Sequence, residues 1–279
     1  MLPADHELGQ IYGASRPTVA RALKILTKEK LIHRKAGFGT CVLAPNKSML
    51  VAGLLIPQLH KIEIFEPICA SLIETATEQG LQIIRPSELS LSQDRRVLAQ
   101  SLVEQFIQTK VHGVFFAPIE HIDDPVEFNL SILKQLEEAG IKVVLLDRDV
   151  YTWPRKTPYD LVGIDNIEAG FTMTNHLIGN GCSKLAFVSA ENPAMTVQLR
   201  LIGCREAHIQ NKMRARDLIT LEYPDGKIEG VACRILEEKI DGVVCANDAT
   251  AAPLLRALLN LGARIPQDVK VCGFDDVKY

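Results

Sequence analysis

Between residues 50 and 273, short runs of apolar residues alternate with longer segments whose apolar positions recur at the spacing of a helix face. The apolar runs are continuous, which is typical of parallel strands covered on both faces. The pattern predicts strands at 50–56, 81–85, 113–117, 142–147, 161–164, 184–189, 218–221, 242–246 and 269–273. Between them it predicts helices at 64–79, 94–109, 129–139, 168–180, 197–210, 228–238 and 250–261. Repeated strand–helix units of this kind predict an α/β fold built on parallel sheets.

Two stretches of this region echo each other. Val111–Pro118 reads VHGVFFAP and Ile240–Asn247 reads IDGVVCAN, and in each half the next strand ends in an acidic residue. Between the halves lies an irregular stretch, 148–160, which is long for a connection inside a compact α/β lobe. We therefore expect two similar lobes, at 51–155 and 156–279, with a cleft between them.

Polar side chains follow the predicted strands at the ends where ligands of parallel sheets bind. Asp147 closes one strand of the first half, and Asp275 follows the last strand of the second half. Asn247 and Asp248 follow the strand at 242–246. One of these two is expected to bind a ligand and the other to cap the next helix. A hydroxyl group is both a donor and an acceptor, so it can donate to a carboxylate at such a position and can donate to or accept from an amide.

The first 44 residues follow a different pattern, of two short helices and a hairpin. A helix begins at Asp5 and ends at Gly13, and a second follows Ser15. Ser15 is expected to accept a hydrogen bond from the Thr18 N–H, and a proline is tolerated in the first helical turn. Val19, Leu23 and Leu26 recur on one face, which predicts a helix packed on a small core.

The opposite face of that second helix is basic. Its exposed positions are expected to be Arg16, Thr18, Arg21, Lys24 and Lys28. Two strands at 31–35 and 40–43, joined by a glycine-bearing turn, complete a hairpin with basic residues. Helix, turn, helix and basic hairpin predict a winged-helix DNA-binding domain at 1–44, followed by a polar linker at 45–50.

Charge is divided unevenly along the chain. Residues 1–44 hold seven lysines and arginines and three acidic residues, a net charge of +4. Because the whole chain has a net charge of −3, residues 45–279 have a net charge of −7. A basic domain on an acidic body suits a protein that touches a phosphate backbone with one end only. Apolar residues make up 47% of the chain and charged residues 23%, the composition of an ordinary globular protein.

Residues 2–42 resemble the DNA-binding domain of GntR-type bacterial transcription regulators. The shared features are the Leu-Pro start, an acidic first helix, Ser-Arg-x-Thr-Val from Ser15, and Gly-x-Gly-Thr from Gly37. The resemblance implies that a helix precedes Leu2, so we expect the first helix of the domain to be missing. His6 and Ala20 depart from the family pattern, which has arginine at both positions. The DNA-binding residues expected are Ser15, Arg16, Thr18, Arg21, Lys35, Gly37 and Gly39.

The region from about residue 50 to the end is similar to the effector domain of LacI-type regulators, which resembles periplasmic sugar-binding proteins. The matching segments, in order, are Val162–Gly170, Leu177–Gly181, Arg200–Gly203, Ala246–Asp248, Ile265–Val269 and Gly273–Asp276. The resemblance implies further strands and a helix after Asp276, so the C-terminal end is expected to be truncated. A GntR-like domain joined to a LacI-like body is an architecture of sugar-responsive repressors, as in arabinose repressors.

The resemblance also implies which residues meet the ligand. The family positions fall on Phe65, Asp147, Arg200, Asn247 and Asp275, and Arg148 and Asp248 are added as neighbouring candidates. Phe65 can cover a sugar ring or simply belong to the core, and Trp153 can stack on a sugar or pin the crossover. These residues predict a sugar-sensing cleft without a metal or cofactor.

The predicted function is a ligand-responsive transcription regulator, with operator DNA, a small-molecule effector and a second copy of the chain as partners. The absence of a signal peptide and of a long apolar run predicts a cytoplasmic protein. Adjacent acids and scattered histidines give no catalytic motif, which argues against an enzyme. A sugar-binding protein without functional DNA binding stays open as the alternative.

Seven cysteines, with no C-x-x-C pair, argue against a disulfide framework. Those in apolar surroundings are expected to be buried as small hydrophobic residues: Cys69, Cys204, Cys233, Cys245 and Cys272.

Overall fold

The computed structural model describes residues 2–28, 31–35, 39–42, 50–57, 64–85, 94–224 and 226–277. By its internal contacts the chain divides into two compact units, Met1–Leu50 and Val51–Tyr279. Of the linker expected at 45–50, only Leu50 is among the described residues, as the first residue of a strand.

The N-terminal unit contains the elements that its sequence pattern predicts. These are α1 (Asp5–Ile11), α2 (Arg16–Lys28), β1 (Ile32–Lys35) and β2 (Gly39–Val42). The two strands pair antiparallel, with Ile32 opposite Val42. Gly13 lies between the helices with φ at +59°, a conformation that glycine adopts without strain. The predicted helix–turn–helix and hairpin are therefore present.

The core of this unit is small. Val19 and Leu23 from α2 and Ile32 from β1 are buried, and Leu26 packs against them. Arg34 on β1 donates two hydrogen bonds to the carboxylate of Asp5, at 2.9 and 2.8 Å, which ties the hairpin to α1. The three buried apolar side chains among the described residues of this unit supply little hydrophobic free energy, so the Arg34–Asp5 ion pair helps to fix the position of the hairpin.

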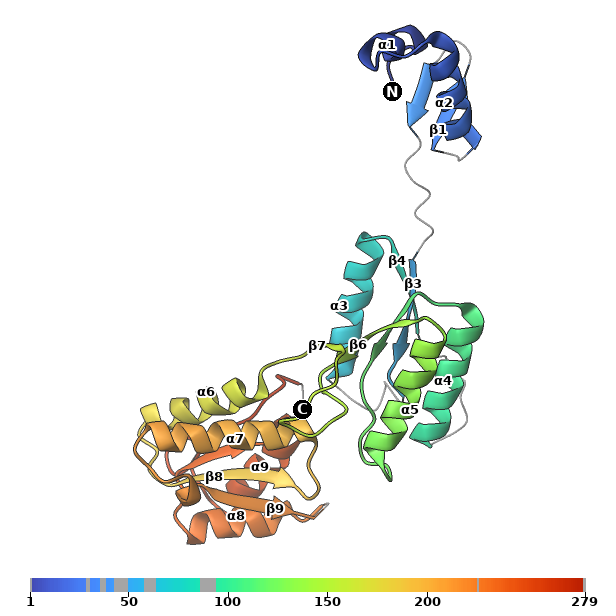
Figure 1. Ribbon diagram of the computed structural model, residues 1–279. Helices are drawn as coiled ribbons and strands as arrows, with labels where there is room; N and C mark the ends of the chain where they lie inside the picture. Colours follow the sequence, from blue (N-terminus) through green and yellow to red (C-terminus); the bar gives the residue numbers. More distant parts are fainter. Residues whose placement is uncertain are drawn as a thin grey trace. The chain divides into compact units, whose positions relative to one another are not determined.

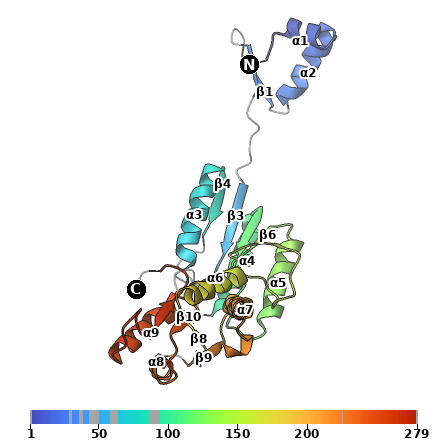
Figure 2. The ribbon, with the colours of Figure 1, turned by 90° about the vertical axis from the view of Figure 1, so that its left-hand side faces the viewer.

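The second unit begins with a lobe built on a five-stranded parallel sheet in the order β4-β3-β5-β6-β7. Its strands are β3 (Leu50–Leu55), β4 (Leu81–Ile84), β5 (Gly113–Phe116), β6 (Lys142–Leu146) and β7 (Asp160–Val162). Helix α3 (Phe65–Glu78) covers one face, and α4 (Arg95–Thr109) and α5 (Pro125–Glu138) cover the other (Figures 1 and 2). We call this the first lobe.

The second lobe has a four-stranded sheet in the order β11-β10-β8-β9. Its strands are β8 (Leu185–Ala190), β9 (Ile219–Tyr223), β10 (Gly242–Cys245) and β11 (Lys270–Cys272). Helices α6 (Asn166–Gly179) and α7 (Met195–Gln210) lie together on one face, and α8 (Ile228–Glu237) and α9 (Asp248–Asn260) cover the other. A short 3-10 helix, Ala215–Asp217, precedes β9.

The predicted repetition between the lobes is confirmed by strand order. In the first lobe β5 lies between β3 and β6, and in the second β10 lies between β8 and β11. The two echoing segments therefore occupy corresponding strands. Because β7 pairs with β6, the first sheet includes a strand beyond the boundary expected between 155 and 156.

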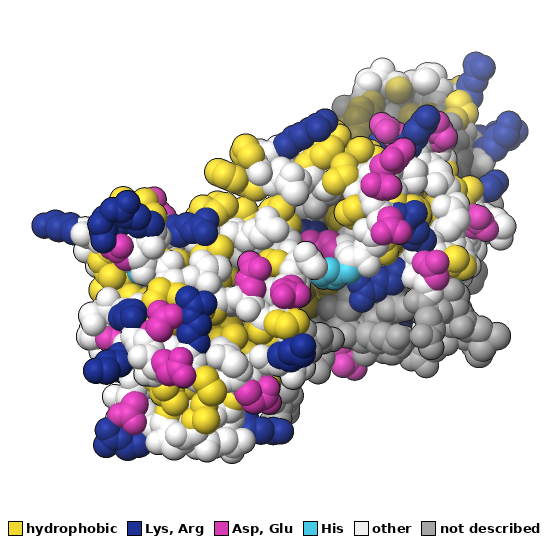
Figure 3. Space-filling view, turned by 90° about the horizontal axis from the view of Figure 1, so that it is seen from below, with side chains coloured by type: hydrophobic (Ala, Val, Ile, Leu, Met, Phe, Trp, Pro, Cys, Tyr) yellow, Lys and Arg dark blue, Asp and Glu magenta, His cyan; other side chains and the backbone are white. Residues whose placement is uncertain are grey.

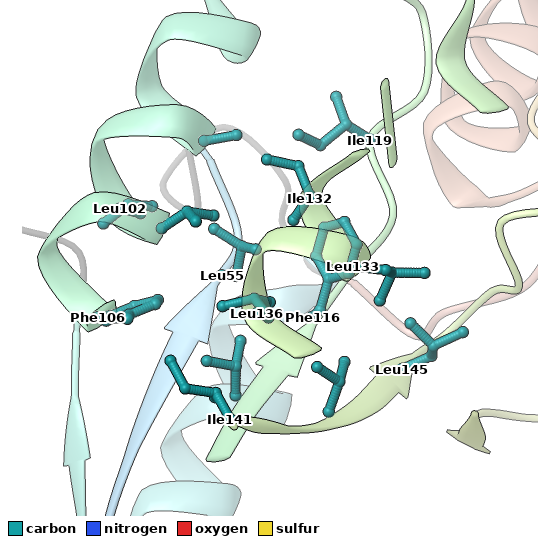
Figure 4. Close-up of a cluster of buried hydrophobic side chains, with 14 of the residues drawn as sticks. Leu55, Leu102, Phe106, Phe116, Ile119, Ile132, Leu133, Leu136, Ile141 and Leu145 are labelled. Atoms are coloured by element: carbon teal, nitrogen blue, oxygen red, sulfur yellow. The ribbon is translucent and has the colours of Figure 1, made fainter. Parts of the chain in front are cut away.

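Successive side chains along a strand point to opposite faces of the sheet, so each sheet contributes side chains to two hydrophobic cores, one on each face. In the first lobe, Val114 and Phe116 of β5 face α4 and α5, whereas Phe115 packs on the α3 side. Figure 4 shows Phe116 of the sheet beside Leu133 and Leu136 of α5, and Leu102 and Phe106 of α4 in the same cluster. The continuous apolar runs of the sequence are explained by this coverage of both faces.

Two predictions about local structure need correction. Helix α5 begins at Pro125, four residues before the expected start, because proline is accepted in the first turn of a helix. Cys233 is exposed rather than buried, since the apolar face of α8 is formed by Ile228, Val231 and Ile235. None of the described helices is both long and apolar enough to cross a membrane.

Candidate functional site: a cavity between the two lobes

A cavity of ≈440 Å³ lies between the lobes of the second unit. It is lined by residues that follow β3, β5 and β6 in the first lobe, and by residues that follow β10 and β11 in the second. The start of α7 closes one side. The carboxyl ends of both parallel sheets therefore face one hollow, where ligands of such sheets bind. Its volume is in the range of small-molecule sites, roughly 300–1,000 Å³.

Arg200 is the most firmly held polar side chain of this cavity. It is 5% exposed and lies on α7. Its Nε donates to Asn166 Oδ1 at 2.9 Å, its Nη1 to the Ala246 carbonyl oxygen at 2.5 Å, and its Nη2 lies 3.5 Å from Asp275 Oδ1. The guanidinium also stacks on the Phe274 ring, 4.4 Å from the ring centroid. A buried charge with this many partners has a fixed orientation.

The expected division of roles between Asn247 and Asp248 is not found, because Asn247 is placed both at the cavity and at the start of the next helix. Asn247 lines the cavity and also caps α9, since its Oδ1 accepts from the Thr250 N–H at 2.9 Å. Asp248 is not brought to the cavity. Its Oδ2 accepts from the Val277 N–H at 3.2 Å, so its carboxylate is turned toward the segment that carries Asp275.

Asp147 and Arg148 form the charged part of the first lobe's wall. Arg148 donates to Asp147 Oδ2 through Nε at 2.9 Å and approaches it through Nη2 at 2.7 Å. Its Nη1 forms an ion pair with Glu120 Oε2. All three side chains are less than one-fifth exposed. Sequence reasoning missed Glu120, because this residue follows β5 without any periodic or motif signal.

Burial shifts the ionisation of these groups. It raises the pKa of the Asp147 carboxyl to about 6, with Arg200 opposing the shift and Asp275 adding to it. The pKa of Asp275 is likewise raised by burial, against the effect of Arg200. Burial lowers the pKa of Arg148 to about 10, and the neighbouring Arg95 acts in the same direction. The site therefore holds one carboxyl group, that of Asp147, whose protonation responds to mild acid.

The two aromatic candidates, Phe65 and Trp153, line different hollows. Phe65, at the start of α3, is 1% exposed and belongs to the first lobe's core, but it also lines the cavity. Trp153 is half exposed and lines a different hollow of ≈330 Å³, beside the crossover segment. The two hollows share Asp147, Arg148 and Thr196. Trp153 is thus a neighbour of the site rather than part of its lining.

The DNA-binding candidates of α2 belong to the N-terminal unit, and their side chains are exposed to solvent. Arg16, Thr18 and Arg21 are exposed, as are the departures His6 and Ala20. The Ser15 cap is confirmed, because the Thr18 N–H approaches Ser15 Oγ at 3.4 Å and the two hydroxyl groups lie 2.8 Å apart.

The hairpin candidates are described only in part. Gly39 begins β2 with φ at +85°. Gly37 and the Lys35 side chain lie outside the described residues.

The charge pattern differs between the two units. On the face of the molecule drawn in Figure 3, acidic and basic side chains of the second unit are interspersed. The exposed positions of α2 include four lysines and arginines, Arg16, Arg21, Lys24 and Lys28, and no acid. Within the described part of the chain no group of three histidines, cysteines or acids is arranged to hold a metal ion.

Comparison with known proteins identifies both regions. Residues 1–42 match the family model of bacterial regulatory proteins of the gntR family, and residues 174–279 match that of the periplasmic binding protein-like domain. The arabinose metabolism transcriptional repressor of Geobacillus stearothermophilus is 26% identical over 290 residues, which cover 100% of this chain and 76% of that protein.

Solved structures agree on the fold. A complex of the transcriptional regulator CelR with cellobiose superposes with a TM-score of 0.62 at 21% identity, covering 99% of this chain and 83% of that one. A LacI family transcriptional regulator from Enterococcus faecium with bound ribose gives a TM-score of 0.61 at 22% identity, over 80% of this chain and 76% of that one. Each of these proteins is named as a transcription regulator.

Proposed function

We propose that this chain, which joins a gntR-type N-terminal region to a periplasmic binding protein-like body, is a transcription regulator that responds to a small polyhydroxylated effector. The observation that carries the proposal is the cavity, into which the carboxyl ends of two parallel sheets converge. The protein binds an effector there and operator DNA through the N-terminal unit. It acts as a repressor, like the relatives whose names say so.

The balance of charge favours an uncharged effector. Among the described residues, the charged groups that line the cavity are Arg95, Glu120, Asp147, Arg148, Arg200 and Asp275. Three guanidinium groups thus face three carboxyl groups, and ion pairs join Arg148 to Glu120 and Asp147, and Arg200 to Asp275. A phosphate or carboxylate ligand would upset this balance, whereas a hydroxyl group donates to a carboxylate and accepts from a guanidinium.

The effector residues proposed are those of the lining. Asp147 and Arg148 bind hydroxyl groups from the first lobe, and Arg200, Asn247 and Asp275 bind them from the second. Phe65 covers an apolar ring face. Asp248 serves this site indirectly, by holding the segment that presents Asp275. Names of relatives and neighbours, which mention arabinose, ribose and cellobiose, indicate a pentose, a hexose or a short oligosaccharide as the class to test.

The DNA-binding residues proposed are Ser15, Arg16, Thr18 and Arg21 on α2, with Lys35, Gly37 and Gly39 in the hairpin. Ser15 fixes the start of the helix, while Arg16 and Arg21 present charge to the phosphates. The chain acts as a homodimer in the bacterial cytoplasm, so that two such helices meet two half-sites of one operator. The division into a DNA-binding unit and two effector lobes is part of the same proposal.

A thermal-shift screen of common pentoses, hexoses and disaccharides tests the effector site, because a ligand of the folded state raises its melting temperature. The sugar that raises it is then added to a titration of operator DNA, for which a change of affinity is expected. A sugar that binds while DNA affinity stays constant would contradict the regulatory role.

The DNA-binding unit is tested separately by salt. Log affinity for DNA is expected to fall linearly with log salt concentration. Arg16→Ala lowers DNA affinity and reduces that slope, with sugar affinity unchanged. Arg216→Ala, in the short 3-10 helix of the second lobe, is the matched control and leaves both affinities unchanged.

A further inference from the structure

Glu120 touches both lobes of the second unit. It follows β5 and lines the cavity, and its side chain is 19% exposed. Its Oε1 accepts a hydrogen bond from the N–H of Met195 at 3.0 Å. Met195 is the first residue of α7 in the second lobe, so this bond crosses the cavity from one lobe to the other.

The bond satisfies a need of α7. The residue before the helix is Ala194, whose side chain cannot accept a hydrogen bond, so the first N–H groups of α7 have no local cap. A carboxylate placed there supplies the missing acceptor and a negative charge that favours a helix N-terminus. Glu120 therefore caps a helix of the opposite lobe, and this is possible only while the lobes are close together.

The second carboxylate oxygen of Glu120 is also in use. Oε2 forms an ion pair with Arg148, whose guanidinium reaches Asp147 on its other side. The Glu120 carbonyl oxygen accepts from Arg95 Nη1 at 3.2 Å, which fixes the loop after β5 to α4. Both side-chain oxygens of Glu120 thus hold protein groups, one in each lobe.

From this geometry we infer that Glu120 is the positioning residue that joins lobe closure to the arrangement of the effector site. In the closed arrangement it holds α7, which carries Arg200, and it orients Arg148 in the first lobe. When the lobes separate, the Met195 N–H loses its acceptor, and Glu120 no longer links the two halves. Glu120 favours the closed state of the ligand-free protein by about tenfold, the effect of one charge-assisted hydrogen bond.

The inference rests on the proposed function only in treating the cavity as the effector site. Its test therefore needs no ligand. The distance between the lobes is measured in the full, ligand-free chain by pulsed electron spin resonance. One spin label is placed on the naturally exposed Cys233 of the second lobe and one on the first lobe through Lys134→Cys, in a Cys41→Ser background.

Two variants remove the link from opposite sides. Glu120→Gln keeps the shape but has one acceptor oxygen, so it can serve either Met195 or Arg148 and not both. Met195→Pro removes the N–H itself. Proline is accepted at the first position of a helix, and Ala194 already has the extended conformation, φ −54° and ψ 155°, that precedes proline. Both variants are expected to raise the ratio of long to short distances about tenfold.

Matched controls separate this effect from others. Met195→Ala removes the side chain and keeps the N–H, so the distances of the parent protein are expected. Glu127→Gln, on the exposed first turn of α5, makes the same charge change with no effect on the distances. Unchanged distances in both Met195→Pro and Glu120→Gln, with cooperative melting retained, would overturn the inference. If Glu120→Gln does not fold, the comparison of Met195→Pro with Met195→Ala decides it alone.

Discussion

Each of the two lobes of the second unit places an aspartate after a corresponding strand of its parallel sheet. Asp147 follows β6 and Asp275 follows β11, strands that correspond in sheet order, and both residues have positive φ, 69° and 97°. Their basic partners differ. Arg148 is the sequence neighbour of Asp147, whereas Arg200 reaches Asp275 from α7.

This difference shows how each half of the site is fixed. Arg200 is held by groups of its own lobe: Asn166, Ala246 and Asp275. Arg148 is held by Asp147 and by Glu120, which itself bonds to the opposite lobe. The second lobe therefore presents its part of the site ready-formed, and the first lobe completes its part when the lobes close.

The largest effect on stability is expected where two helices of the second lobe pack most closely. Helices α6 and α7 approach so closely that a Cβ at Gly203 would lie 1.9 Å from the Ile167 carbonyl oxygen. Gly203→Ala must push the helices apart, and we expect it to lower the free energy of unfolding by about 3 kcal/mol or more. Urea denaturation measures this.

The control for that substitution lies in α8. A Cβ at Gly230 would meet no atom within 4 Å, so Gly230→Ala is expected to be neutral or to stabilise by up to about 1 kcal/mol. Equal stabilities of the two variants would mean that the close approach of α6 and α7 is not needed.

The next largest change in the free energy of unfolding is expected when one guanidinium group is removed from either lobe. Arg200→Met leaves Asn166 Oδ1 and the Ala246 carbonyl oxygen without their buried donor, and we expect a cost of about 3 kcal/mol. Arg148→Met is expected to cost less, about 1–2 kcal/mol, because the Asp147 carboxyl can take up a proton instead. A larger loss for Arg148→Met would reverse the comparison of the lobes. Both variants are compared by urea denaturation at pH 7.

The stability of the folded protein is also expected to depend on pH. Since the folded-state pKa of Asp147, about 6, lies above its ordinary value of 3.8, the folded protein binds more protons than the unfolded chain between these pH values. Stability contributed by this group is present at the acidic end and is lost as the pH rises to about 6, with about 3 kcal/mol as the upper bound. Asp147→Asn removes this part of the slope. A parent protein and variant with identical slopes would indicate that Arg148 keeps the carboxyl ionised throughout.

The smallest effect on stability is expected at Asp248. Asp248→Ala removes the acceptor of the Val277 N–H and frees the segment that presents Asp275, at a cost of about 1 kcal/mol in unfolding free energy. Effector affinity is expected to fall about tenfold, measured by calorimetry with the sugar found in the screen. Asp248→Asn retains an acceptor oxygen and serves as the control. An affinity unchanged by Asp248→Ala would show that this tether does not position Asp275.

Much of this arrangement follows from local sequence. Continuous apolar runs specify buried parallel strands, the Val19–Leu23–Leu26 spacing specifies the packed face of α2, and Ser15 specifies where that helix begins. Acidic residues at strand ends also pointed to the edge of each sheet at which the cavity lies, because the ends of parallel strands meet at one edge.

Tertiary structure alone decided which polar groups meet. Arg200 binds groups at 166, 246 and 275, and Glu120 bonds to Met195, pairs far apart in the chain and without any shared periodicity. Local patterns record which side of a helix or strand is buried. Strand order and lobe closure, which no local pattern records, bring the cavity's charges within hydrogen-bond distance and turn Asp248 away from it.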